Sequence, residues 1–145
     1  MKTTTHLKFI QWRDPAGLHE DTVKSIRDIK FLKDELQFLK DLAAEHTLEL
    51  IYGTSTEESH SIINELAEHS KRLEKLFKSL EEHRNNLQIL MDEDDVAGEL
   101  NTYKNQHYTL MIAEMDFHAD LKKTKHIIFK LLSDIMKKSK QKKIS

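Results

Sequence analysis

The sequence contains no cysteine, one proline and only three glycines among its 145 residues. The lack of cysteine excludes disulfides, thiolate metal ligands and cysteine nucleophiles. Charged residues make up 33% of the chain and hydrophobic residues 38%. Together with the scarcity of proline and glycine, this balance predicts long helices that face solvent on one side rather than a disordered chain.

Long apolar runs are also missing from the sequence. No stretch approaches the ~18 apolar residues of a membrane span, and Met1–Trp12 lacks the continuous apolar segment of a secretory signal. We therefore expect a cytoplasmic protein without a transmembrane segment.

Signals of catalysis and of nucleic-acid binding are scarce. The sequence has no glycine-rich phosphate loop and no strained turn that holds a serine, so nucleophilic catalysis finds no support. Specific nucleic-acid recognition is disfavoured because no aromatic residues interleave with the lysines and arginine is rare. The four arginines are Arg13, Arg27, Arg72 and Arg84. These observations favour a non-catalytic protein.

The glycines and the proline fall where helices should begin or end. A chain of 145 residues has the size of one domain. Connections between the helices are too short for anything but antiparallel neighbours. The sequence therefore predicts an all-α fold, an antiparallel, coiled-coil-like bundle of three long helices with a short N-terminal arm. In a single domain spanning 1–145, we expect an arm at 1–14, helices at about 15–52, 55–92 and 94–139, and a basic tail at 137–145.

The first helix has a clear start signal in Asp14-Pro15. Aspartate is a favoured N-cap residue, and proline suits the first helical position because its missing N–H costs nothing there. Gly17, two residues later, allows a kink or a restart of the helix.

The other helix ends carry comparable signals. Gly53 is placed to end the first helix as a C-terminal cap. Ser55 and Glu58 have the spacing of a capping box, which predicts the start of the second helix. The acidic run Asp92–Asp95 suits the N-terminus of a third helix through capping and the helix dipole. A calcium-binding loop is the alternative for this run, but the alternate spacing and the central glycine of an EF-hand are missing.

Apolar residues recur at a and d spacing in all three segments, which predicts a shared core. The first stripe is Ile29, Leu32, Leu36, Leu39, Ala43 and Leu50; the second is Ile62, Leu66, Leu73, Leu76, Leu80, Leu87 and Leu90; the third is Val96, Leu100, Tyr103, Leu110, Phe117, Leu121, Ile128, Leu131 and Ile135.

Two of the helices carry a second apolar row for which a three-helix core has no use. These rows are Phe31, Phe38 and Leu42 on the first helix, and Tyr108, Met111, Met115, Phe129, Leu132 and Met136 on the third. The surplus predicts a homodimer or contact with another helical protein. We expect the arm, with Leu7, Phe9, Ile10 and Trp12, to pack across the bundle and cover part of these rows. Its alternative role is a recognition peptide for another protein.

Four histidines and one glutamate occupy the positions at which the apolar stripes are interrupted. These positions are His46, His69, His83, His107 and Glu114, and His118 follows at eleven residues from His107 on the same side of its helix. The antiparallel arrangement predicts that His69 lies near His118 and that His83 lies near His107.

Three interpretations of these inward imidazoles remain open. In the first, they hydrogen-bond each other or a facing carboxylate, because a buried imidazole without a partner costs roughly 1–3 kcal/mol. In the second, they bind a transition metal such as zinc, iron, copper or nickel in the bundle core. In the third, they sense pH. The candidate metal ligands are His69, His83, His107, Glu114 and His118.

Sequence support for the metal site is limited. No His-x-x-x-His pair occurs, and only Glu57-x-x-His60 matches the repeated motif of di-iron bundles. A likeness to ferritin-like or hemerythrin-like bundles rests on helices and histidines alone and transfers no site.

The C-terminal region is rich in lysine. Lys137–Lys143 is expected to complement the negative end of the helix dipole at a solvated, frayed helix end. Weak contact with an anionic surface is the alternative. The sequence as a whole predicts a helical protein-interaction module, with the metal-binding bundle as its alternative.

Overall fold

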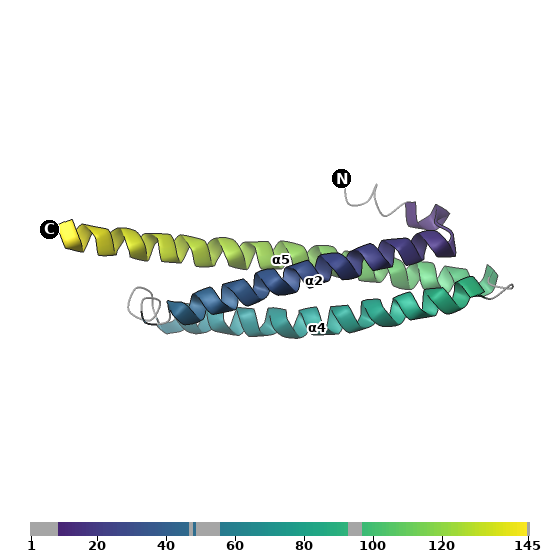
Figure 1. Cartoon of the computed structure of the whole chain (residues 1–145), viewed down its shortest axis with the longest axis horizontal. Helices are drawn as coiled ribbons and strands as arrows, with labels where there is room; N and C mark the ends of the chain where they lie inside the picture. Colours follow the sequence, from purple (N-terminus) through teal and green to yellow (C-terminus); the bar gives the residue numbers. More distant parts are fainter. Residues whose placement is uncertain (1–8, 47, 49–55, 93–96, 145) are drawn as a thin grey trace. The chain divides into compact units, whose positions relative to one another are not determined.

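A computed structural model of the chain describes residues 9–46, 48, 56–92 and 97–144. Almost all of these residues are helical, and the described part of the chain contains no strand. The elements are a short 3-10 helix, η1 (Phe9–Trp12), and three α-helices, α2 (Pro15–Glu45), α4 (Thr56–Asp92) and α5 (Ala97–Ile144) (Figure 1). The three helices pack against one another, so the predicted all-α three-helix bundle is confirmed.

The start of α2 is capped as the sequence predicts. The Gly17 N–H donates a hydrogen bond to Asp14 Oδ1 at 2.8 Å, and the Leu18 N–H donates to the Asp14 carbonyl at 3.0 Å. Helix α2 continues through Gly17, so the helix does not restart there. A Cβ atom at Gly17 would lie 2.9 Å from Asp14 Oδ1. Glycine therefore serves here to let the capping carboxylate come close to the helix.

The remaining boundaries are only partly open to comparison. Helix α2 ends at Glu45, and the predicted end at residue 52 and the Gly53 cap fall outside the described residues. Helix α4 begins at Thr56 as expected, whereas Ser55 of the predicted capping box lies outside the described part. The acidic run continues into residues 93–96, which are not described either.

Helix α5 is longer than predicted, because it ends at Ile144 and not near residue 139. Lysine has a high helix propensity, and its charge is favourable near the negative end of the helix dipole, so the basic tail belongs to the helix. Within the described residues, none of the helices combines the length and apolar character that a membrane span needs.

The structure divides into two compact units, and each takes a segment from all three long helices. Unit 1 consists of Met1–Phe31 and Leu73–Asp116, and unit 2 consists of Leu32–Arg72 and Phe117–Ser145. Because the first half of α2 shares a unit with the second half of α4 and the first half of α5, α4 is antiparallel to both of its neighbours. A single domain spanning residues 1–145 stays a prediction.

The core of unit 1 includes the described part of the arm. Ile10 of η1 is buried in a cluster with Leu18, Leu87 and Leu90. Half-buried residues of α5 pack against this cluster, namely Leu100, Tyr103, Met111 and Ile112. The predicted packing of the arm is therefore confirmed for Ile10. Trp12, which was expected to pack as well, is 85% exposed, and residues 1–8 lie outside the described part.

The core of unit 2 follows the predicted stripes with one exchange. Its buried apolar residues are Leu32, Leu36, Leu39, Ala43, Ile62, Leu66, Phe117, Leu121, Ile128 and Leu132. Leu132 was assigned to the second row and Leu131 to the core, but the structure buries Leu132 and leaves Leu131 half-buried. Positions 128 and 132 are four residues apart, a step that the helical period allows as readily as the step of three to Leu131.

Candidate functional site

Two buried histidines meet in unit 1, as the sequence predicts. His83 lies on α4 and His107 on α5, and His83 Nε2 is 3.1 Å from His107 Nδ1. The ring centroids are 5.2 Å apart with an interplanar angle of 32°. Together with Arg13, Asp21 and Thr22 these residues form what we call the histidine cluster.

The first part of α2 supplies the polar surroundings of His107. Asp21 Oδ2 lies 3.5 Å from His107 Nε2, and Thr22 Oγ1 lies 3.5 Å from His107 Nδ1. Arg13 binds the Asp21 carboxylate through Nη2 at 2.7 Å and through Nε at 3.3 Å. The Thr22 hydroxyl donates to the Leu18 carbonyl at 2.8 Å, as a buried helical threonine commonly does.

Electrostatics favours one tautomer arrangement in the cluster. An N–H at His107 Nε2 points its positive end toward the Asp21 carboxylate, which leaves His107 Nδ1 to accept a hydrogen bond from His83 Nε2–H. Under this assignment His83 Nδ1 carries a bare lone pair. That nitrogen is buried and has no hydrogen-bond partner among the described residues. His107 Nε2 also has no hydrogen-bond partner among the described residues. The Asp21 Oδ2 atom is 3.5 Å away, which is an ion-pair distance, but the contact does not have the geometry of a hydrogen bond.

Burial keeps both imidazoles of the cluster neutral. Burial, with a smaller contribution from the nearby His107, lowers the pKa of His83 to about 4. The pKa of His107 is also lowered, mainly by burial, although Asp21 acts against this shift. The histidine cluster therefore contains two neutral rings in the core, and the partly exposed Asp21–Arg13 ion pair lies beside His107.

Unit 2 contains a second buried histidine with a different partner. His69 Nε2 on α4 lies 2.8 Å from Thr124 Oγ1 on α5. The single proton of the Thr124 hydroxyl has two other acceptors nearby, the Asp120 carbonyl at 3.2 Å and Glu65 Oε2 at 3.4 Å. We assign the proton to these oxygens, so that the Thr124 oxygen accepts a hydrogen bond from His69 Nε2–H. Burial lowers the pKa of His69, with a smaller contribution from the positive charge of Arg72.

An aromatic contact completes the surroundings of His69. The Phe117 ring meets the imidazole edge to face at 6.0 Å between centroids. The Arg72 guanidinium lies 5.4 Å from the centre of the same ring and pairs with Asp120 at 2.9 Å. These contacts hold the ring of His69 between α4 and α5.

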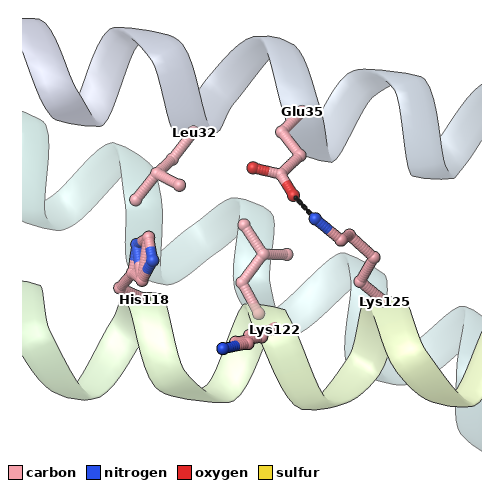
Figure 2. A pocket seen from close by; sticks show the side chains of 6 residues that line it. Leu32, Glu35, His118, Lys122 and Lys125 are labelled. Carbon is pink, nitrogen blue, oxygen red and sulfur yellow. Dashed lines mark hydrogen bonds and ion pairs between the residues drawn. The ribbon is translucent and has the colours of Figure 1, made fainter.

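His118 is not an inward residue, and this prediction is wrong. In unit 2 the buried positions of α5 are Phe117, Leu121 and Thr124, and His118 lies one residue beyond Phe117 with its side chain exposed. The seven-residue repeat from 117 to 124 gives the core position to phenylalanine. His118 instead lines a shallow pocket between α2 and α5, together with Leu32, Glu35, Leu121, Lys122 and Lys125. Figure 2 shows Glu35 in this pocket paired with Lys125, at 2.7 Å.

The other candidate ligands show no convergence on a metal. Glu114 is half-buried in unit 1, and burial raises the pKa of its carboxyl group while Ser25 acts against this shift. In the described part of the chain, no three or more His, Asp or Glu side chains are grouped so that they could hold a metal ion. A structural zinc site needs four ligands and a catalytic one at least three. Metal binding by His69, His83, His107, Glu114 and His118 stays a prediction.

Two threonines of these sites were not identified from the sequence. Thr22 and Thr124 are both buried. Thr22 precedes the core residue Ile29 by seven positions, and Thr124 follows Phe117 by seven. Continuing the heptads through polar residues would therefore have found both.

An exposed apolar surface lies between α2 and α5 of unit 2. The Glu35–Lys125 ion pair shows that these flanks of the two helices are neighbours. Residues three, four, seven or eleven positions further along a helix lie on nearly the same side. Counted from Glu35, Phe38 and Leu42 therefore continue this flank on α2. Counted from Lys125, Phe129 and Met136 continue it on α5. Phe38 is 55% exposed, Phe129 41% and Met136 62%, while Leu42 is half-buried. We call these four residues the α2–α5 face.

Comparison with known proteins gives no match to a protein-family model, to a curated protein or to a solved structure.

Proposed function

We propose that this protein is a non-catalytic helical interaction module that forms a homodimer through the α2–α5 face of unit 2. The observation that carries the proposal is the exposure of two phenylalanines and a methionine on adjacent helix flanks. Contiguous apolar surface of this kind marks interaction sites more often than it occurs without a partner.

The residue types of the face support this proposal. Phenylalanine and methionine are enriched in protein interfaces, and burying one such side chain contributes roughly 1.5–3 kcal/mol relative to its exposed state. The surrounding core already fills the space inside unit 2 with leucine, isoleucine and Phe117. Phe38 and Phe129 therefore gain burial only from a partner outside the unit.

The histidine cluster fits a structural role within such a module. The nitrogens of its rings face each other and the side chains of unit 1, and both rings are buried. A general base needs access to a substrate proton, whereas these neutral rings are enclosed by the core.

Sedimentation equilibrium tests the proposed homodimer directly. We expect the wild-type chain to sediment with twice its monomer mass of 17.1 kDa, and the double variant Phe38→Ser/Phe129→Ser to sediment as a monomer. Ile63→Ser is the matched control, because Ile63 is 52% exposed in unit 2 but lies on α4, outside the face. Circular dichroism checks that all variants keep their helical content. A monomeric wild type, or a double variant that dimerises like the wild type, would refute the proposal.

A further inference from the structure

Charged residues of opposite sign border the α2–α5 face on its two sides. On α2, Asp34 lies four residues before Phe38. Asp41 lies three residues after Phe38, and Glu45 lies seven residues after it. At roughly 100° per residue, they fall on the side of Phe38 that points away from Glu35 and Leu42. All three are exposed. We call them the acidic rim.

The corresponding border on α5 is basic. Lys130 and Lys137 fall on the side of Phe129 that points away from Lys125, and both are exposed. Lys122, His126 and Lys140 lie between this line and Phe129. These five residues form the basic rim, which contains no acidic residue.

The two rims have matching levels along the helices. Helices α2 and α5 run in the same direction in unit 2, because in their common pocket Leu32 lies beside His118, whereas the later residue Glu35 pairs with the later residue Lys125 (Figure 2). The Glu35–Lys125 ion pair sets the register. In this register Asp41 lies within one residue of the level of Lys130 and Glu45 within two residues of the level of Lys137, on opposite sides of the α2–α5 face.

The rims are not engaged with one another inside the chain. Among the described residues no salt bridge involves Asp41, Glu45, Lys130 or Lys137, and the Asp41 carboxylate accepts a hydrogen bond from Gln37 of its own helix at 2.9 Å. The α2–α5 face separates the two rims, so the charges of one rim do not reach those of the other within the chain.

From this pattern we infer that the partner of the face is a second copy of this chain, related by a two-fold axis that runs parallel to the helices. Such an axis places α2 of one copy opposite α5 of the other, so that each acidic rim meets a basic rim at the same level. A two-fold axis perpendicular to the helices within the interface would instead place acidic rim on acidic rim. The inference rests on the proposed homodimer and adds its orientation and the residues that determine it.

Chemical cross-linking between differently labelled copies tests the orientation, and the lack of native cysteine makes the labelling specific. Chains carrying Asp41→Cys are mixed with chains carrying Lys130→Cys and treated with a short bismaleimide. We expect a several-fold higher yield of cross-linked dimer from the mixture than from either variant alone. Lys71→Cys, an exposed position on α4 of unit 2, is the control partner for Lys130→Cys and should give only the background yield.

Charge reversal provides a second measurement of the same inference. Reversing the acidic rim with Asp41→Lys/Glu45→Lys should weaken dimerisation about tenfold, because lysine then faces lysine at both copies of the contact. Adding Lys130→Glu/Lys137→Glu to the same chain should restore it.

The outcomes separate this inference from the proposed function. A wild type that is dimeric by sedimentation but cross-links best between identical positions, or a four-residue variant that stays weak, would overturn the orientation alone. A monomeric wild type would overturn both.

Discussion

In unit 1 the imidazole of His107 faces a second imidazole, whereas in unit 2 the imidazole of His69 faces a threonine hydroxyl. Both sites lie between α4 and α5, and burial lowers the pKa of all three histidines. The two sites differ in whether the partner of the imidazole can itself be protonated. The Thr124 hydroxyl stays neutral and accepts the His69 N–H, but two imidazoles together hold two sites that acid can protonate. Unit 1 therefore holds two buried imidazoles that acid can protonate and unit 2 holds one, so we expect unit 1 to be the more acid-sensitive part of the core.

The largest expected effect is therefore a loss of stability of unit 1 in acid. His83 has a pKa of about 4 in the fold and about 6.5 in the unfolded chain, so the unfolded chain binds the proton first. The stabilisation from the neutral ring is complete above about pH 6.5 and is lost as the pH falls toward 4. For His83 alone this amounts to about 3 kcal/mol of unfolding free energy.

Urea unfolding at a series of pH values, compared with the variant His83→Leu/His107→Leu, measures this effect. Replacing both partners of a buried polar pair by apolar groups is nearly neutral at high pH, so the two proteins should diverge mainly in acid. His60→Leu, an exposed histidine, should follow the wild type. Parallel curves for the wild type and the double variant would show that the cluster does not carry the acid sensitivity.

A smaller effect is expected from removing the hydroxyl partner in unit 2. In Thr124→Val the buried His69 Nε2 loses its hydrogen-bond acceptor, which should cost about 1–3 kcal/mol of unfolding free energy at neutral pH. Thr109→Val is the control, because the Thr109 hydroxyl is exposed and donates to the Asn105 carbonyl of its own helix. A loss equal to that of the control would mean that His69 finds another partner and that the two units differ less than the structure indicates.

The smallest effect is expected at the equivalent threonine of unit 1. Thr22 lies 3.5 Å from His107, but the imidazole of His83 already supplies the nearer partner at 3.1 Å. Thr22→Val should therefore cost less than about 1 kcal/mol, clearly below the cost of Thr124→Val. Thermal unfolding of the two variants side by side gives the comparison. A larger loss at Thr22 than at Thr124 would reverse our assignment of partners to the two imidazoles.

Much of the bundle followed from local sequence signals. The Asp14-Pro15 start, the core stripes and the inward placement of His69, His83 and His107 all depend on helical periodicity and on capping, which act within a few residues. The same periodicity, combined with short connections, was sufficient to bring His83 to His107. Periodicity failed at His118 and Leu132, where two neighbouring positions compete for one place in the seam. Only the packing of the facing helices decides between them.

The sequence by itself determined that this chain is a set of amphipathic helices with imidazoles on their inner sides, because side-chain direction along a helix depends on spacing alone. Only the tertiary structure decided what each imidazole meets. Whether the partner is a second ring, a hydroxyl or a carboxylate depends on the register between helices, and a shift of one turn exchanges one partner for another. The α2–α5 face has the same origin, since its four residues come from two helices that the Glu35–Lys125 contact places in register.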